Sequence, residues 1–294
     1  MTVPLLTVVV AVKGAPENLD EILARLGCSR SPRVQFCFAC AGPPPTGLPR
    51  GENCETLEGA ARALVPELWR NGILRAKADR VALMTTQCVP TSDWINALLK
   101  ADLAAHVGVG GAIDLGAARG AAQRAIYLLR YSYFTPQRAA GIVADIAADN
   151  AVYRTAAIRE HDDLLRNGFW EPSFHRRFAR QGLSLYFNPS LLVTYCGREP
   201  PLTFVGVRFS HGREYGLSRA SAAPLARRLS WVAASPLIAP LILARVIARA
   251  LPRTRLRRIL PSAVPWLMLF VLAWSLGEAR GYLDSLLSSE KKLV

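Results

Sequence analysis

The sequence lacks the short motifs that identify several large classes of enzyme. It contains no glycine-rich phosphate loop, no nucleophile elbow and no His and Glu pair at the spacing of metal ligands. Histidine is itself scarce, with 4 residues in a chain of 294, and neither His106 nor His161 has a partner in the sequence. The function therefore has to be inferred from longer and less specific patterns.

The six cysteines form no convincing disulfide or metal framework. Cys37 and Cys40 have a C-x-x-C spacing, but they lie in an apolar segment and no second pair accompanies them. We therefore expect buried free thiols in a reducing compartment. An export signal is not expected either, because the first apolar run, Leu5–Val12, is too short and wrongly flanked.

Acidic residues are in short supply, and the deficit is concentrated in one part of the chain. Asp and Glu number 22 against 36 Lys and Arg, so the net charge is +14. Residues 206–294 contain 14 Lys and Arg against 4 Asp and Glu, which leaves only +4 for the first 205 residues. Such asymmetry indicates an anionic partner. Because the arginines flank apolar runs instead of alternating with aromatic residues, we expect a membrane surface with anionic lipids and no nucleic acid.

Two apolar runs in residues 206–294 have lengths typical of membrane-associated helices. Trp231–Ala244 is uncharged but contains Pro236 and Pro240, and Ile259–Gly277 is an uncharged run of 19 residues, just long enough to span a bilayer. The segment between the runs contains Arg253, Arg255, Arg257 and Arg258. A spanning hairpin would place these arginines on the far side from a cytoplasmic domain, against the positive-inside rule. We therefore expect the first run to lie in the membrane interface. Whether the second run crosses stays open, and either run is alternatively a buried helix of a soluble protein.

Apolar strands alternate with helical segments through the first 205 residues. The predicted strands are Leu5–Val12, Val34–Phe38, Arg80–Met84 and Val107–Ile113. The predicted helices are a segment that ends near Leu26, Leu57–Trp69 and Trp94–Leu103. This alternation predicts an α/β domain over residues 1–205 with a mostly parallel sheet, followed by a basic, apolar helical region over residues 206–294.

One strand of this sheet ends in a run of polar residues. Arg80–Met84 continues into Thr85, Thr86 and Gln87, and Trp94 then opens a helix. Ligands of such sheets bind at the carboxyl ends of the strands. We therefore expect these three polar residues to border a cleft.

Five segments of the chain, taken in order, resemble a known family. They are residues 8–19 (VVVAVKGAPENL), 76–94 (AKADRVALMTTQCVPTSDW), 149–154 (DNAVYR), 171–182 (EPSFHRRFARQG) and 277–283 (GEARGYL). In the fourth segment, Glu171 is followed by apolar residues at +3 and +7, arginine at +6 and glycine at +11. The chain thus resembles membrane-bound family 2 glycosyltransferases over most of residues 5–215. This resemblance implies a GT-A fold, with a Rossmann-like sheet flanked by helices, and a nucleotide-sugar donor.

The resemblance fails where the family binds its metal ion. Members of the family hold a divalent cation on the donor diphosphate with Asp-x-Asp, and Thr85, Thr86 and Gln87 occupy those positions here. Neutral oxygens are poor replacements for two carboxylates around Mg²⁺ or Mn²⁺. The family's acid at the end of the second strand is also replaced, by Ala39 and Cys40. We expect the three polar residues to contact the donor and transfer to be independent of metal.

Glu171 occupies the position of the family's catalytic Asp. The resemblance implies that it deprotonates the acceptor hydroxyl in an inverting transfer. Phe169, Trp170 and Phe174 are expected to desolvate Glu171 and to raise its pKa. Alternatively, Glu171 and Pro172 simply open a helix, where an acid and a proline are both common. His175, on the same predicted helix, either reaches the cleft or lies on the helix surface, and we expect the surface position.

Other candidates concern the donor diphosphate and the acceptor. Arg213 and His211, which lie in RFSHGREYGLSRA, either neutralise the diphosphate or bind lipid headgroups. Asn150 either binds acceptor hydroxyls or opens a turn. Gly110 and Gly111 allow close approach of the backbone to the sugar or to a neighbouring strand.

The hypothesis that unites these features is an inverting glycosyltransferase of the cell membrane with its catalytic domain on the cytoplasmic side. Its acceptor would be lipid-linked or otherwise held at the membrane. The alternative is a catalytically inactive glycosyltransferase-like scaffold, which the missing donor-site acids favour. A two-carboxylate hydrolase is disfavoured, because no second acid pairs recognisably with Glu171.

Overall fold

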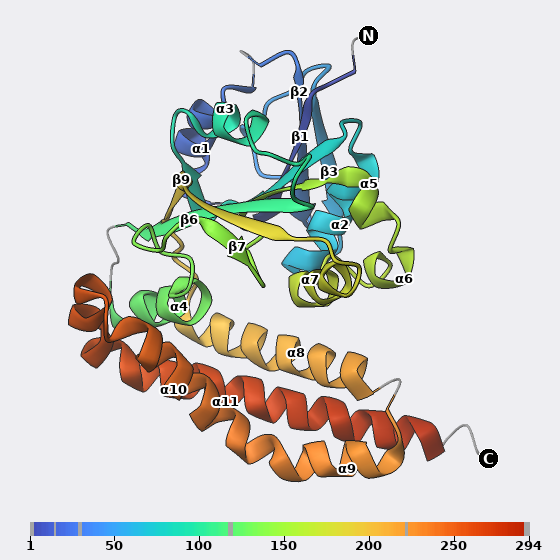
Figure 1. The fold of residues 1–294 in the computed structure, drawn as a ribbon, viewed down its shortest axis with the longest axis vertical. Helices are drawn as coiled ribbons and strands as arrows, with labels where there is room; N and C mark the ends of the chain where they lie inside the picture. Colours follow the sequence, from blue (N-terminus) through green and yellow to red (C-terminus); the bar gives the residue numbers. More distant parts are fainter. Residues whose placement is uncertain (1–2, 15, 29–30, 117–119, 221–222, 291–294) are drawn as a thin grey trace. The chain divides into compact units, whose positions relative to one another are not determined.

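The computed structural model describes residues 3–14, 16–28, 31–116, 120–220 and 223–290 of the 294-residue chain. The chain divides into two compact units (Figure 1). The first consists of Met1–Ala117 and Phe134–Gly197, and the second of Ala118–Tyr133 and Arg198–Val294. A helical segment from the middle of the sequence therefore belongs to the same unit as the C-terminal region.

A nine-stranded sheet forms the centre of the first unit. Its strands are β1 (Leu6–Lys13), β2 (Val34–Ala41), β3 (Cys54–Gly59), β4 (Arg80–Thr85), β5 (Cys88–Pro90), β6 (Gly108–Leu115), β7 (Gly141–Val143), β8 (Asn150–Arg154) and β9 (Leu185–Tyr195). The strand order is β3-β2-β1-β4-β8-β6-β9-β5, and β7 pairs with β9. The four strands predicted from the sequence correspond to β1, β2, β4 and β6, so those predictions are confirmed.

The sheet is mixed and not mostly parallel. Strands β1 to β4 pair in parallel, but β8 lies antiparallel between β4 and β6. Strand β9 is parallel to β6 and antiparallel to β5 and β7. Because β7 is antiparallel to β9 and β9 is parallel to β6, β7 and β8 run in the same direction, opposite to β4 and β6. The alternation of strands and helices in the sequence could not reveal this.

The helices of the first unit are α1 (Leu19–Leu26), α2 (Val65–Arg75), α3 (Trp94–Leu99), α5 (Thr155–Arg159), α6 (Asp162–Leu165) and α7 (Glu171–Arg180). The helix predicted over Leu57–Trp69 is wrong, because its first residues form the edge strand β3 and α2 begins only at Val65. Pro66 lies in the first turn of α2, where a proline is well tolerated. Helix α3 is also shorter than predicted and ends at Leu99.

The core of the first unit lies on both faces of β1 and β2. Seven of the eight residues of each strand are buried, in agreement with their continuous apolar sequence. Helix α7 adds Phe174 and Phe178, which pack with Phe169 and Tyr153 in an aromatic cluster. This cluster fixes α7 against the sheet and thereby positions the residue at its N-terminus, Glu171.

The second unit is helical. It contains α4 (Ala121–Tyr131), α8 (Pro201–Ala220), α9 (Leu225–Ala234), a 3₁₀ turn (Ser235–Leu237), α10 (Ile238–Ala250) and α11 (Thr254–Glu290). Helices α8 and α11 lie along one another (Figure 1). Four glycines line their contact: Gly212, Gly216, Gly277 and Gly281. A Cβ atom on any of them would lie within 2.5 Å of a backbone carbonyl of the other helix. This is the small-residue contact by which helices approach closely in membranes.

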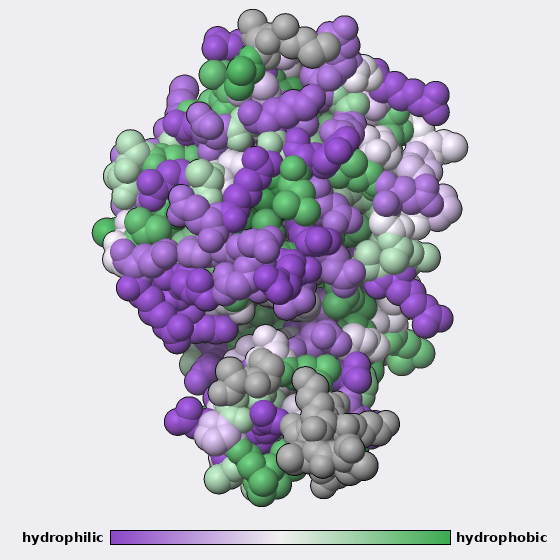
Figure 2. Space-filling model, turned by 90° about the vertical axis from the view of Figure 1, so that its right-hand side faces the viewer, coloured by the Kyte–Doolittle hydropathy of each residue, from purple (hydrophilic) through white to green (hydrophobic). Residues whose placement is uncertain are grey.

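Two segments of this unit are long and apolar enough to cross a membrane, Leu225–Ala250 and Thr254–Leu287. The first includes the 3₁₀ turn at Pro236, the site at which the sequence predicted an interruption. Exposed leucines occur along both segments, including Leu229, Leu241 and Leu276. Across much of the face in Figure 2, by contrast, hydrophilic residues separate the hydrophobic ones. The two apolar helical segments could therefore contact lipid.

Candidate functional site

The polar run Thr85, Thr86 and Gln87 lies at the carboxyl end of β4 and leads into β5. Thr85 and Thr86 are buried, and the Thr86 N–H donates to the carbonyl of Ala11 in β1 at 3.2 Å. The Gln87 carbonyl accepts from the N–H of Cys196 at 2.8 Å. Backbone hydrogen bonds on both sides therefore hold this turn in place.

Asp149 lies beside this strand end, and sequence reasoning gave it no role. The Thr85 hydroxyl donates to Asp149 Oδ1 at 3.0 Å, and Asp149 is only 4% exposed. Asp149 ends the loop 144–149, directly before β8. The DNAVYR segment was the sequence signal available, but nothing local in it pointed to a partner 64 residues away.

Glu171 is the first residue of α7, so the prediction that it opens a helix is confirmed. Its Oε1 accepts a hydrogen bond from the N–H of Ala148 at 2.5 Å. Ala148 precedes Asp149 in the same loop. Two consecutive residues of this loop therefore contact the two sites: Ala148 binds the carboxylate of Glu171, and the carboxylate of Asp149 binds Thr85.

His175 lies one helical turn after Glu171 and is only 2% exposed, so the expected surface position is wrong. Its Nδ1 lies 3.1 Å from Asp145 Oδ1, and its Nε2 lies 3.1 Å from the Tyr153 hydroxyl. Its burial follows from the aromatic cluster, because α7 presents this face to β8. Helical periodicity could have identified the buried face, since Phe174 and Phe178 flank His175 on it.

The loop 144–149 is therefore attached at three points. His175 contacts Asp145, Glu171 accepts from Ala148, and Asp149 accepts from Thr85. Burial is the main cause that raises the pKa of Tyr153 well above its usual value, and the negative charges of Glu171, Asp145 and Asp149 add to it. The arrangement gathers three carboxylates of the first unit around one loop next to the end of β4.

The residues at this strand end do not fit the metal site of Asp-x-Asp enzymes. Within the described ranges, no group of three or more His, Cys, Asp or Glu side chains is arranged to hold a metal ion. Asp149 is a single carboxylate, and it accepts the hydroxyl proton of Thr85. One engaged carboxylate with neutral oxygens is a weak donor set for Mg²⁺ or Mn²⁺.

The residues predicted to bind the acceptor lie where β6, β8 and β9 meet. Asn150 is fully buried, accepts from Trp94 Nε1 at 2.8 Å and donates to two backbone carbonyls at 2.8 and 2.9 Å. A Cβ atom on Gly111 would lie 1.9 Å from the carbonyl oxygen of Leu191 in β9. One on Gly110 would lie 2.4 Å from Cβ of Ile146. The glycines thus admit close packing by neighbouring segments, and binding of an acceptor here stays a prediction.

The residues predicted to neutralise the diphosphate, Arg213 and His211, belong to α8 in the second unit. Arg213 Nε donates to Asp284 Oδ2 at 2.7 Å, and its Nη1 lies 3.6 Å from Glu214 Oε1. Two carboxylates therefore already compensate the charge of Arg213. A role of either residue in donor binding stays a prediction.

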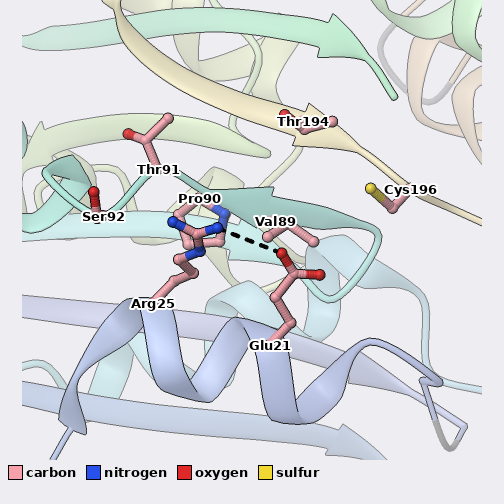
Figure 3. A pocket seen from close by; sticks show the side chains of 8 residues that line it. All are labelled: Glu21, Arg25, Val89, Pro90, Thr91, Ser92, Thr194 and Cys196. Atoms are coloured by element: carbon pink, nitrogen blue, oxygen red, sulfur yellow. Dashed lines mark ion pairs between the residues drawn. The ribbon is translucent and has the colours of Figure 1, made fainter. Parts of the chain in front are cut away.

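A pocket of about 310 Å³ lies between α1 and the strands β5 and β9 (Figure 3). Its lining residues are Glu21, Arg25, Val89, Pro90, Thr91, Ser92, Thr194 and Cys196. Glu21 and Arg25 form an ion pair at 3.7 Å across one side of it. None of the predicted site residues lines this pocket, although Val89 is only two residues from Gln87.

Comparisons with known proteins give a match in structure only. No protein-family model and no curated sequence matches the chain. Among solved structures, the chain is similar to the mannosyltransferase PcManGT from Pyrobaculum calidifontis, solved in complex with GDP-Man and Mn²⁺. The TM-score is 0.51 at 12% identity, over 94% of this chain and 87% of that one. The chain therefore has the fold of a glycosyltransferase.

Proposed function

We propose that the protein is an inverting glycosyltransferase of family 2 and GT-A type, which moves a sugar from a nucleotide-sugar donor to an acceptor held at the membrane. The observation that carries this proposal is that two consecutive residues of one loop connect Glu171 to the end of β4: Ala148 donates to Glu171, and Asp149 accepts from Thr85. In a chain with a glycosyltransferase fold, the carboxyl end of a central strand is the expected position of the donor.

In the proposed reaction, Glu171 acts as the general base. An acceptor hydroxyl gives its proton to the Glu171 carboxylate while its oxygen forms a bond to the anomeric carbon of the donor sugar. The bond from that carbon to the diphosphate oxygen breaks on the opposite side, so the configuration inverts. The nucleoside diphosphate leaves with the bonding electron pair.

The Ala148 N–H fixes the direction of the Glu171 carboxylate. A hydrogen bond to one carboxylate oxygen holds the side chain in place and so orients the proposed base. Asp149, held by Thr85, keeps the loop at the strand end. A fixed base reduces the entropy lost when the acceptor is positioned for reaction.

We further propose that the diphosphate is bound without chelation of a metal ion by Asp-x-Asp. Thr85, Thr86 and Gln87 would contact the donor through hydroxyl and amide groups, with Arg213 and His211 as candidate cations. Substitution of Arg213 by Ala tests whether this arginine contributes to donor binding. Donor affinity that does not change would remove Arg213 from the site.

The acceptor is proposed to be lipid-linked or otherwise attached to the membrane, with catalysis on the cytoplasmic side. Two apolar helical segments with exposed leucines, and the arginines between them, support association with anionic lipid. Carbonate extraction of membranes tests this association. Release of the protein into solution would contradict embedded segments.

Binding of nucleotide sugars is the first test of the function. UDP-, GDP- and dTDP-linked sugars would be titrated against the full chain in detergent with EDTA present, and one donor is expected to bind. Glu171→Gln should then reduce turnover by about 10²–10⁴-fold with little change in donor affinity. Glu160→Gln, at an exposed position outside the site, is the matched control. Full turnover by Glu171→Gln would exclude Glu171 as the base.

A catalytically inactive scaffold is the second candidate function. The observation that favours it is the absence of an acid pair at Thr85, Thr86 and Gln87. It predicts that no donor binds under chelation and that neither Mg²⁺ nor Mn²⁺ restores binding.

A further inference from the structure

Helix α7 meets the loop 144–149 at two points that lie one helical turn apart. Glu171 accepts from the Ala148 N–H, and His175 Nδ1 lies 3.1 Å from Asp145 Oδ1. Residues four positions apart share a face of a helix, so both side chains reach the loop from the same side of α7. A single contact would leave the loop free to rotate about it, whereas two contacts fix its direction along the helix.

The imidazole of His175 is held on both sides. Its Nε2 lies 3.1 Å from the hydroxyl of Tyr153 in β8, and the residue is only 2% exposed. A carboxylate only accepts hydrogen bonds, so Nδ1 donates to Asp145 and, in the neutral ring, Nε2 accepts from Tyr153. His175 therefore connects the sheet, through Tyr153, to the first half of the loop, through Asp145.

The contact with Asp145 lies close to the proposed base along the chain. The side chain of Asp145 is 56% exposed, whereas the loop becomes buried from Ile146 onwards. Only two residues separate Asp145 from Ala148, whose N–H binds Glu171. A displacement of Asp145 is therefore transmitted over a short stretch of backbone to the hydrogen bond that orients Glu171.

We infer that His175, through its hydrogen bond to Asp145, positions Glu171 for the transfer reaction. The inference rests on the proposed function, in which Glu171 is the base. His175 acts through the loop and does not touch the substrate, so it is a positioning residue. A displacement of about 1 Å in a reacting group can lower a rate by about 10²-fold, and a loop fixed on both sides prevents such a displacement.

Asp145→Ala tests this inference without opening a cavity in the core. Asp163→Ala is the matched control, because Asp163 Oδ2 accepts from Arg177 of the same helix at 2.8 Å and its side chain is 55% exposed. Each substitution removes an exposed acid that pairs with α7. Only Asp145 belongs to the loop that binds Glu171.

Turnover is measured as release of nucleoside diphosphate from the UDP-, GDP- or dTDP-linked sugar that binds, with the full chain in detergent. Water replaces the acceptor: it gives a proton to Glu171, and its oxygen bonds to the anomeric carbon as the diphosphate leaves. Asp145→Ala should lower kcat by about 10- to 100-fold with donor affinity unchanged, and Asp163→Ala should change neither. A wild-type kcat in Asp145→Ala would overturn the inference.

Two substitutions of His175 separate its two contacts. Asn places an amide N–H near the position of Nδ1 and keeps the donor to Asp145, whereas Gln reaches the position of Nε2 and keeps the contact with Tyr153. Both remove the ring from the core. We expect His175→Asn to retain most of kcat and His175→Gln to lose as much as Asp145→Ala. Equal losses in the two variants would show that the ring acts by packing alone, and would overturn the role of His175.

Non-additivity separates positioning from general destabilisation. In a Glu171→Gln background, Asp145→Ala should cause no further loss of turnover, because the carboxylate that it positions has already been removed. A loss that adds to that of Glu171→Gln would contradict the inference, since it would place the effect of Asp145 elsewhere.

Amide hydrogen exchange provides a readout that needs no catalysis. Exchange in peptides that contain Ala148, followed by mass spectrometry on the full chain, should be faster in Asp145→Ala and His175→Gln than in wild type and Asp163→Ala. Unchanged exchange would overturn the attachment of the loop by His175. If no nucleotide sugar binds while exchange responds as expected, the proposed function fails and the attachment of the loop stands.

Discussion

Substitution of Gly277 by Ala tests the packing of the second unit. Gly277 lies on α11 against α8, and a Cβ atom there would lie 2.1 Å from the carbonyl oxygen of Phe209 and 3.0 Å from its Cα. Ordinary contacts of a Cβ begin near 3.4 Å. The two helices must therefore separate locally by roughly 1 Å, because a helical backbone cannot rotate out of the way as a side chain can.

The expected cost follows from two opposing effects. Forced insertion of a methyl group into a packed contact costs about 1–3 kcal/mol. Replacement of a helical glycine by alanine gains about 1 kcal/mol from the lower entropy of the unfolded chain. Since the obstacle is backbone, we expect the upper end of the first range and a net loss of about 2 kcal/mol. Gly206→Ala on α8 is the matched control, because a Cβ there meets nothing within 4 Å. It should stabilise the protein by up to about 1 kcal/mol.

Thermal unfolding of the full chain in detergent, followed by circular dichroism, measures both variants. A change of 1 kcal/mol corresponds to about 4–8 °C for a unit of roughly 100 residues. Gly277→Ala should therefore melt lower than wild type and Gly206→Ala slightly higher. Equal melting temperatures for the two variants would refute the close contact of α8 and α11.

Two further predictions concern the first unit. Thr85→Val removes the hydrogen bond to Asp149. It should lower the free energy of unfolding in urea by about 1–3 kcal/mol and weaken donor binding, whereas Thr85→Ser should restore both. Wild-type stability and donor affinity of Thr85→Val would show that this hydrogen bond is unimportant. Burial raises the pKa of Cys37 to about 12 and that of Cys40 to about 11, from a usual value of 9.0. Below pH 9 both thiols are protonated in the folded and in the unfolded chain, and stability does not change with their ionisation. As the pH rises towards the pKa values of the folded state, the free energy of unfolding falls, because the thiols of the unfolded chain ionise first. In urea unfolding, the free energy of unfolding should fall by about 1 kcal/mol per thiol between pH 9 and 10. A variant with Cys37→Ala and Cys40→Ala should show a smaller fall. An equal fall in that variant would refute the assignment of this pH dependence to the two thiols.

The strands of the first unit could be predicted because their signal is local. Val8–Val10 and Val34–Phe38 are apolar runs that only a buried strand or helix accommodates, and their length favours strands. Strand β3 was missed because it is short, has only one large apolar residue, Leu57, and contains no fully buried residue. The antiparallel direction of β8 is defined by its pairing with β4 and β6, which residue patterns do not encode.

The candidate site was only partly accessible from the sequence. Glu171 and Thr85 were found through the order of motifs, and both lie beside the loop 144–149. Asp149 and the buried position of His175 were missed, because each is defined by contacts with residues distant in the chain. Arg213 was predicted to neutralise the donor diphosphate or to bind lipid headgroups, and the sequence did not indicate its contact with Asp284, 71 residues away.

The sequence by itself determined the α/β character of the first unit, the excess of arginine in the second and the absence of acids at Thr85 and Gln87. These features depend only on composition and on the periodicity of apolar residues over short stretches of the chain. Only the tertiary structure decided that Asp149 stands beside Thr85, that glycines bring α8 and α11 into backbone contact, and that Arg208 stacks on the ring of Trp274. Hydrogen bonds and charge compensation act over a few ångströms in space, and folding brings together at that range residues that the chain separates by dozens of positions.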